Sequence, residues 1–199
     1  MPRPKTFTIE NSLLGATATF RQHGYAGASM ALLVKGMGIN RASLYANFGD
    51  KESLYLRCLA AEAEVQLARL YAVAEAEESP IAKVKAILRS QLADMDADKA
   101  KDGCMIATAA AELLPSHLAV AQLVESYYVR LQFLISRCID AAQRTGEVGP
   151  TLHIDNASRF LRGQIAGLRL MGKTQASITE LDAMADWAYQ SLLLAGQTK

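Results

Sequence analysis

The feature that most constrains the fold is a helical spacing of apolar residues that recurs along the chain, each time bounded by capping residues, glycines or prolines. In the first such segment the repeating residues are Ile9, Leu13, Ala16 and Phe20. Thr8 is expected to cap this helix and Gly24 to end it. No stretch alternates apolar and polar residues as a half-buried strand does. The pattern predicts an all-α fold of about nine helices, of which the first three are short.

The boundaries of the other helices follow from the same signals. One helix is expected after Ser29, one after Asn40 and one from Asp50 to about Ala74. The remaining helices are expected over residues 81–98, 104–114 and 115–145, from residue 155, and from 177 to about 196. Ser177 and Glu180 have the spacing of a capping box for the last helix.

The net charge of +1 conceals an asymmetry between the two ends of the chain. Residues 1–51 contain six basic and two acidic residues, a net charge of +4, which leaves −3 for the remainder. Arg3 and Lys5 lie in the first few residues and would form a basic arm. A basic small end joined to a mildly acidic large end predicts a polyanionic partner for the first part only.

Cysteine usage and hydropathy indicate a soluble cytoplasmic protein. Cys58, Cys104 and Cys138 are odd in number and widely spaced, which argues against a zinc module or a disulfide framework. The first residues, MPRPKTF, lack the apolar core of a signal peptide. Charged residues interrupt every apolar run before it reaches the roughly 20 residues of a membrane span.

The sequence contains no pattern that predicts catalysis. The three histidines have no metal-type spacing to a carboxylate, and HExxH, GxSxG and GxxxxGK motifs are absent from the sequence. We therefore expect neither an enzyme nor a bound metal or cofactor.

The segment NRASLYANFGDKESL, residues 40–54, is dense in polar, basic and aromatic residues. On a helical wheel Leu44 and Phe48 form a narrow apolar stripe, whereas Arg41, Ala42, Tyr45 and Ala46 occupy a broad second face. A helix with a thin buried edge and such a face can enter a DNA groove, where Arg reaches base edges or phosphates.

The preceding helix supplies the other half of a helix-turn-helix. It is short, it ends at Gly38, which permits a tight turn, and Ile39 is placed to pack between the two helices. Ser29 at its N-terminus could hold a phosphate together with free backbone amides, and Lys51 could do the same from the next helix.

The run FRQHGYAGASMALLVKGMGINRASLYANFGDKESLYLRCL resembles the DNA-binding domain of TetR-type transcriptional regulators. The residues that match the family pattern are Phe20, Gly24, Tyr25, Ser29, Gly38, Ile39, Leu44, Tyr45, Phe48, Lys51, Glu52 and Leu54. The resemblance implies that Ser29, Asn40, Tyr45 and Lys51 contact phosphates and that Arg41, Ala42 and Ser43 lie nearest the bases. Asn47 departs from the pattern, because the family usually has His there, and Lys35-Gly36 replaces a pair that is usually small or apolar.

The resemblance also implies a DNA-binding domain over residues 1–55 and a helical effector-binding and dimerisation domain over residues 56–199. A homodimeric repressor of this type would leave a palindromic operator when an effector binds. Small and apolar residues on the last two helices are candidates for the dimer interface, namely Gly163, Ala166, Gly167, Leu170, Leu181, Ala185 and Ala188. The alternative is that these residues form the core of a single chain.

Three residues are candidates for sensing an effector. Tyr127 and Phe133 lie in an aromatic, apolar stretch that could line a pocket or form core. Cys104 follows Gly103 at a predicted helix N-terminus, near Lys99 and Lys101, where a thiol pKa is lowered. The run GCMIATAAAEL is similar to one in family members that sense oxidants or electrophiles, and the alternative is that Cys104 is a buried structural residue. An alternative without DNA is a helical ligand-binding protein.

Overall fold

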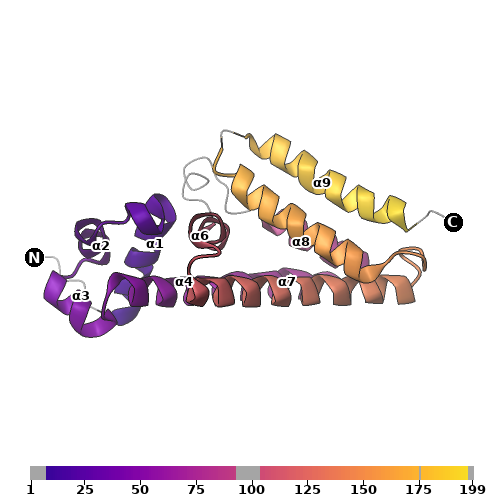
Figure 1. Ribbon diagram of the computed structural model, residues 1–199. Helices are drawn as coiled ribbons and strands as arrows, with labels where there is room; N and C mark the ends of the chain where they lie inside the picture. Colours follow the sequence, from indigo (N-terminus) through magenta and orange to yellow (C-terminus); the bar gives the residue numbers. More distant parts are fainter. Residues whose placement is uncertain (1–7, 93–103, 175, 197–199) are drawn as a thin grey trace, which may run out of the picture. The chain divides into compact units, whose positions relative to one another are not determined.

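The computed structural model describes residues 8–92, 104–174 and 176–196, and that part of the chain contains nine α-helices and no strand (Figure 1). The helices are α1 (Ile9–Gly27), α2 (Met30–Met37), α3 (Arg41–Phe48), α4 (Lys51–Glu75), α5 (Pro80–Ser90), α6 (Met105–Leu113), α7 (Leu118–Arg144), α8 (Ile154–Met171) and α9 (Ile178–Ala195). The prediction of an all-α fold of about nine helices is confirmed, but of the first three helices only α2 and α3 are short, with eight residues each, because α1 spans 19 residues.

The predicted caps are present at the helix N-termini. The side chains of Thr8, Ser29 and Asn40 accept hydrogen bonds from the backbone N–H groups three residues further on, at 3.1, 3.3 and 2.8 Å. Ser177 and Glu180 form the expected capping box. At α4 the carboxylate of Asp50 accepts from the backbone N–H of Ser53 at 2.7 Å, and this hydrogen bond lowers the pKa of Asp50.

Two predicted helix boundaries are wrong. The helix expected to reach residue 98 ends at Ser90, because the backbone N–H of Gln91 turns back to the carbonyl of Leu88 and its side-chain amide donates to the carbonyl of Ile87. The helix expected from Pro115 begins only at Leu118.

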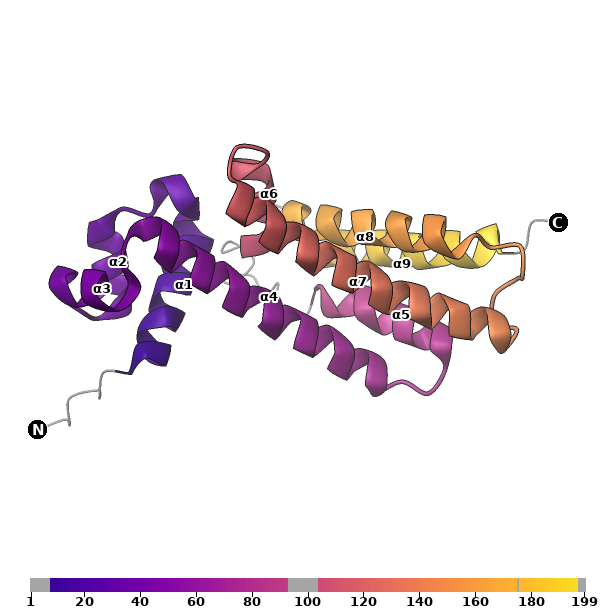
Figure 2. The same ribbon diagram turned by 60° about the horizontal axis from the view of Figure 1, so that its bottom comes forward.

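The described residues divide into two compact units. The first unit contains residues 8–64 and 104–123, which comprise α1–α3, the first part of α4, α6 and the start of α7. The second unit contains residues 65–92, 124–174 and 176–196, with the rest of α4 and of α7 together with α5, α8 and α9. Figure 1 and Figure 2 show α8 and α9 of the second unit lying side by side. No helix among the described residues is long and apolar enough to cross a membrane.

The core of the first unit depends on a close crossing of α1 and α2. A Cβ added at Gly15 would lie 2.2 Å from the carbonyl oxygen of Gly36, so the two backbones meet with no room for a side chain. In the same core Phe20 and Tyr55 pack edge to face, with ring centroids 4.9 Å apart, and both are buried. The crossing fixes α2 on α1 and thereby positions the turn that leads into α3.

Candidate nucleic-acid interface

Helix α3 packs against the rest of the first unit through one narrow face. Leu44 is fully buried and Phe48 is 2% exposed, whereas Arg41, Ala42, Tyr45 and Ala46 are exposed and Ser43 is half-buried. The spacing of these residues predicted this division of faces. The side chains of Ala42, Ser43 and Ala46 are short, so a partner can approach the backbone of α3 closely.

Arg41 and Tyr45 form a preorganised pair on the exposed face. The guanidinium carbon of Arg41 lies 5.7 Å from the centroid of the Tyr45 ring, and its Nη2 donates to the Tyr45 hydroxyl at 3.4 Å. This i, i+4 contact limits the rotamers of two long side chains before any ligand binds. A planar donor fork and a phenol hydroxyl then project together, which suits base edges and phosphate oxygens.

Three further residues that the family resemblance assigns to phosphate contacts lie at helix N-termini. Ser29 is the exposed N-cap of α2, Asn40 is the exposed N-cap of α3, and Lys51 begins α4. The hydroxyl of Ser29 and the amide NH2 of Asn40 still have donors to offer, because their oxygen atoms make the capping bonds as acceptors. The ammonium of Lys51 stands 4.6 Å from the centroid of the Tyr25 ring. Helix N-termini with such donors favour anions.

Asn47, where the sequence departs from the family pattern, faces its own helix. Its side-chain amide donates to the carbonyl of Ser43 at 2.8 Å, and its backbone carbonyl accepts from Nη1 of Arg57 at 3.2 Å. The guanidinium of Arg57 also covers the Phe48 ring at 5.8 Å. Arg57 therefore secures the end of α3, a role that the sequence alone did not predict.

The C-terminal end of α1 is bound by a carboxylate from a distant segment. Gly24 adopts φ +69°, which breaks the helix, and the chain resumes a helical turn at Tyr25. The carboxylate of Glu112 on α6 accepts from the backbone N–H groups of Tyr25 and Ala26 at 2.9 and 2.7 Å. The expected helix end at Gly24 is thus a kink, and α6 supplies the acceptor for the turn that follows it.

Replacing Glu112 with Gln is expected to destabilise the first unit by about 1 to 2 kcal/mol, because two charge-assisted hydrogen bonds are weakened. Urea denaturation of the purified protein measures the change. Glu125 on α7 is exposed, and Glu125→Gln removes the same charge as a control. Equal stability of Glu112→Gln and Glu125→Gln would contradict a structural role for the contact.

The structure also locates the other predicted residues of function. Cys104 is the N-cap of α6, is 8% exposed and makes no side-chain capping bond. Tyr127 is buried, whereas Phe133 is 57% exposed and lines an open pocket on α4, α5 and α7 with Lys83 and Arg137. Arg3, Lys5, Lys99 and Lys101, which entered the sequence argument, lie outside the described residues.

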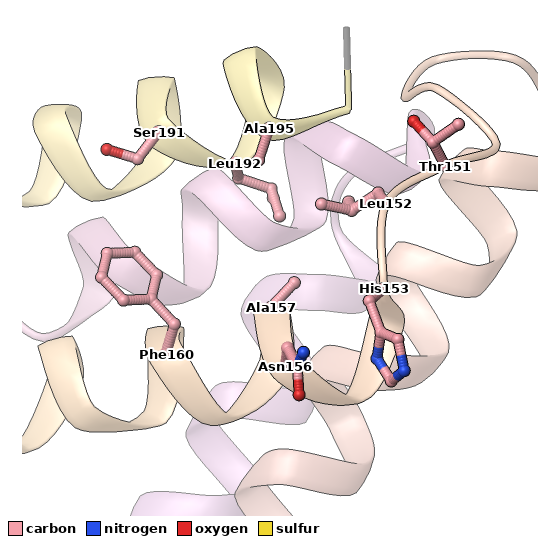
Figure 3. A pocket seen from close by; sticks show the side chains of 9 residues that line it. All are labelled: Thr151, Leu152, His153, Asn156, Ala157, Phe160, Ser191, Leu192 and Ala195. Carbon is pink, nitrogen blue, oxygen red and sulfur yellow. The ribbon is translucent and has the colours of Figure 1, made fainter. Parts of the chain in front are cut away.

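An apolar groove runs along α8 and α9 in the second unit. One pocket of about 350 Å³ is lined by Phe160 of α8, Leu192 of α9 and Leu152 of the loop before α8. In Figure 3 the side chains of Leu152 and Leu192 point toward each other, and the ring of Phe160 lies to one side of them. A second pocket shares Phe160 and Ser191 with it and is also lined by Trp187, whose side chain is 71% exposed.

The residues predicted for the dimer interface differ in exposure. Gly163 and Leu170 are exposed and Ala166 and Gly167 are half-buried, all on α8. On α9, by contrast, three are buried within the single chain: Leu181, Ala185 and Ala188. The exposed large apolar residues of the two helices include Phe160, Leu170, Ile178, Trp187 and Leu194, most of which the small-residue pattern did not indicate.

Two family models and several known proteins match this chain. Residues 13–58 match the family model described as bacterial regulatory proteins, tetR family, and residues 80–188 match that of the tetracyclin repressor-like C-terminal domain. The HTH-type transcriptional repressor ComR of Escherichia coli (strain K12) is 27% identical over 190 residues, which cover 92% of this chain and 88% of ComR. The HTH-type transcriptional regulator YezE of Bacillus subtilis (strain 168) is 28% identical over 188 residues, 94% of this chain and 96% of YezE.

Solved structures show the same fold. A cysteine mutant of the TetR family transcriptional regulator CifR, complexed with 26-bp double-strand operator DNA, has a TM-score of 0.83 and 25% identity, covering 95% of this chain and 99% of that one. A TetR family regulator from Cytophaga hutchinsonii has a TM-score of 0.84 at 16% identity, covering 96% of this chain and 95% of that one. Because the C-terminal domain model alone spans more than half of the 199 residues, the chain belongs to the tetR family of bacterial regulatory proteins.

Proposed function

We propose that this DNA-binding transcriptional regulator is a homodimeric repressor that binds a palindromic operator through α2 and α3 and leaves it when an effector binds to the second unit. Its DNA-binding domain corresponds to residues 1–55 and its effector and dimer domain to residues 56–199. It works in the cytoplasm, where its double-stranded DNA partner is. The observation that carries the proposal is the exposed face of α3, where Arg41 and Tyr45 are paired, in a unit that also presents the capped N-termini of α2 and α3.

The proposed contacts divide by chemistry. Arg41, Ala42 and Ser43 form the first turn of α3 and would lie nearest the base edges, which an Arg fork and small neighbours suit. Ser29, Asn40, Tyr45 and Lys51 would bind phosphate oxygens and fix the register of the helix on the duplex. CifR, which shares the fold and 25% identity, forms a complex with operator DNA, and this supports the same mode here.

A second copy of the chain would complete the DNA-binding unit. One eight-residue helix such as α3 reaches only a few base pairs, so two copies related by a two-fold axis are needed to read a palindrome. The apolar groove of α8 and α9, with exposed Phe160, Leu170 and Trp187, is the surface that a second copy would cover. Gly163, Ala166 and Gly167 would let the paired helices approach closely.

Replacing Trp187 with Lys is expected to weaken dimerisation about tenfold, because a charge would replace an exposed apolar side chain that lines the groove. Sedimentation velocity over a concentration series measures the dissociation constant. Val129 on α7 is 55% exposed and apolar, so Val129→Lys introduces the same charge outside the groove and should leave the dimer unchanged. The proposed interface is wrong if the two variants behave alike.

Sequence-specific DNA binding is tested by fluorescence anisotropy with DNA that flanks the protein's own gene, measured at two salt concentrations. Site-specific binding should weaken steeply with salt, because bound Lys and Arg release counterions from the phosphates. A scrambled duplex of the same composition is the control. Equal affinity for both duplexes would contradict sequence-specific regulation and would favour the helical ligand-binding alternative.

An alternative effector mechanism places a reactive thiol at Cys104. The supporting observation is that Cys104 is the N-cap of α6, the same helix whose Glu112 holds the kinked end of α1. The other thiols are poorer candidates, because burial raises the pKa of Cys58 to about 11 and also raises the pKa of Cys138. A sensor role requires that peroxide or electrophiles release wild-type protein from DNA and leave Cys104→Ser bound. Equal release of both proteins would exclude it.

A further inference from the structure

The second unit contains a buried guanidinium whose hydrogen-bond partners are uncharged. Arg169 lies in the last turn of α8 and is 9% exposed. Its Nε donates to Oε1 of Gln91 at 2.9 Å, and its Nη2 donates to Oε1 of Gln66 at 3.1 Å. Gln91 follows the end of α5 and is fully buried, and Gln66, on α4, is 8% exposed. The three side chains form a polar cluster among three helices.

The positive charge of Arg169 has no counterion among the residues that the structure describes. No carboxylate oxygen of those residues lies within 4 Å of its guanidinium nitrogens. Exposed Arg89, by contrast, pairs with both Asp182 and Asp186. Arg remains protonated in proteins, and a buried charge is costly unless it is paired. Amide oxygens solvate the guanidinium but do not neutralise it.

The guanidinium is oriented and yet retains free donors. Of the five N–H groups that an Arg carries, the two glutamines accept two. Nη1 makes no hydrogen bond to any described residue. Gln91 is itself held, because its Nε2 donates to the carbonyl of Ile87 at 3.1 Å and to the hydroxyl of Ser90 at 3.2 Å. The Nη1–Nη2 edge is thus a fixed donor fork that matches a carboxylate.

We propose that Arg169 binds the anionic group of the effector, and that the effector is an apolar molecule that carries a carboxylate. This inference rests on the proposed function, since it names the ligand class of the effector site. Most of the buried residues that the same three helices contribute nearby in sequence are apolar, and the polar exceptions are Ser90 and Glu62. The apolar ones are Leu67, Leu70, Ile87, Leu88, Ile165 and Leu168. A bound carboxylate would supply a counterion that the described residues do not, and an apolar body suits the apolar side chains among these neighbours.

The test compares carboxylates with neutral analogues of the same shape. Thermal unfolding is followed at constant ionic strength with straight-chain carboxylates from butanoate to dodecanoate and with benzoate and phenylacetate, each beside its primary amide. Carboxylates should raise the Tm of the wild type and amides should not, and calorimetric titration then gives the Kd. Arg169→Gln should weaken carboxylate binding roughly 10- to 100-fold. Arg162→Gln, on the same helix, should bind as the wild type does.

Gln66→Glu tests, without any ligand, whether a carboxylate beside Arg169 stabilises the protein. The new carboxylate would stand where the Gln66 amide oxygen now accepts from Arg169. We expect it to raise the Tm of the unliganded protein and to suppress the response to carboxylates. This variant also decides the question if Arg169→Gln does not fold.

The proposal is overturned if no carboxylate of the series raises the Tm of the wild type, if the amides bind equally well, or if Gln66→Glu still responds to carboxylates as the wild type does. All of these measurements use protein without DNA. Operator binding by the unliganded wild type is measured separately, so a failure of the proposed function would appear there while carboxylate binding by Arg169 remained.

Discussion

Replacing Gly15 with Ala is expected to lower the stability of the first unit by about 3 kcal/mol and to abolish specific DNA binding. The added methyl carbon would lie 2.2 Å from the carbonyl oxygen of Gly36 and 2.8 Å from its carbonyl carbon. Both are backbone atoms, so no rotamer change relieves the overlap and α2 has to move away from α1. Ala is favoured over Gly inside a helix by only about 1 kcal/mol, so the clash outweighs the gain in helix propensity.

The matched control for this substitution lies at the end of the same helix. A Cβ at Gly27 would meet only the Cβ of His23 at 3.6 Å, an ordinary contact, so Gly27→Ala should leave stability unchanged or raise it slightly. Gly36→Ala approaches the crossing from the other side, where the new Cβ would lie 2.3 Å from the hydroxyl of Thr19. We expect it to be less harmful than Gly15→Ala, because the Thr19 side chain can rotate at the loss of its bond to the Gly15 carbonyl.

Hydrogen–deuterium exchange localises the effect within a chain of two units. Peptides from α1 and α2 should exchange much faster in Gly15→Ala, whereas peptides from α8 and α9 should be unaffected. Gly27→Ala should show the wild-type pattern throughout. If Gly15→Ala folds with wild-type protection and binds operator DNA normally, then the close crossing of α1 and α2 does not position the reading helix.

What the sequence could predict was local. Caps at Thr8, Ser29 and Asn40 are recognised by residue type at a fixed offset from an apolar pattern, and the buried edge of α3 follows from helical spacing alone. Each of these features is decided within about one helical turn. The all-α fold and the orientation of α3 therefore followed from the residues themselves.

The features that escaped prediction join distant segments. The Gly15–Gly36 crossing involves two glycines, which in the sequence look only like residues of low helix propensity. Glu112 accepts hydrogen bonds from backbone N–H groups that lie 86 and 87 residues away in the sequence. The early end of α5 depends on Gln91, whose side-chain oxygen accepts from Arg169 on α8. No local pattern encodes such pairs, because either partner alone is compatible with an uninterrupted helix.

The last two helices show a different ambiguity. Helical periodicity marks one face of α9 as apolar, but it does not say whether that face meets the same chain or another copy. Leu181, Ala185 and Ala188 are buried within the chain, whereas Trp187 on the same helix is exposed. Side-chain size does not separate the two cases, because small residues pack closely in intramolecular and intermolecular contacts alike.

Replacing Arg41 with Ala is expected to weaken binding to the operator by roughly 10- to 100-fold, the cost of losing a bidentate base contact. Fluorescence anisotropy with specific and scrambled duplexes separates the two possible roles of this side chain. Loss of a base contact reduces specificity, whereas loss of a phosphate contact weakens binding to both duplexes and lowers the salt slope by about 1. Arg144→Ala removes one exposed positive charge from the end of α7 and should change neither quantity.

Arg41→Lys and Tyr45→Phe sharpen this experiment. Lys keeps the charge but has no planar fork, so it should retain binding to the scrambled duplex and lose discrimination between duplexes. Tyr45→Phe keeps the ring near the Arg41 guanidinium and removes the hydroxyl that accepts from Nη2 at 3.4 Å. If the pair acts as one preorganised unit, the combined effect of Arg41→Ala and Tyr45→Phe will be smaller than the sum of the separate effects. Strict additivity would show that the two side chains contact DNA independently and that their pairing on the free helix contributes nothing to recognition.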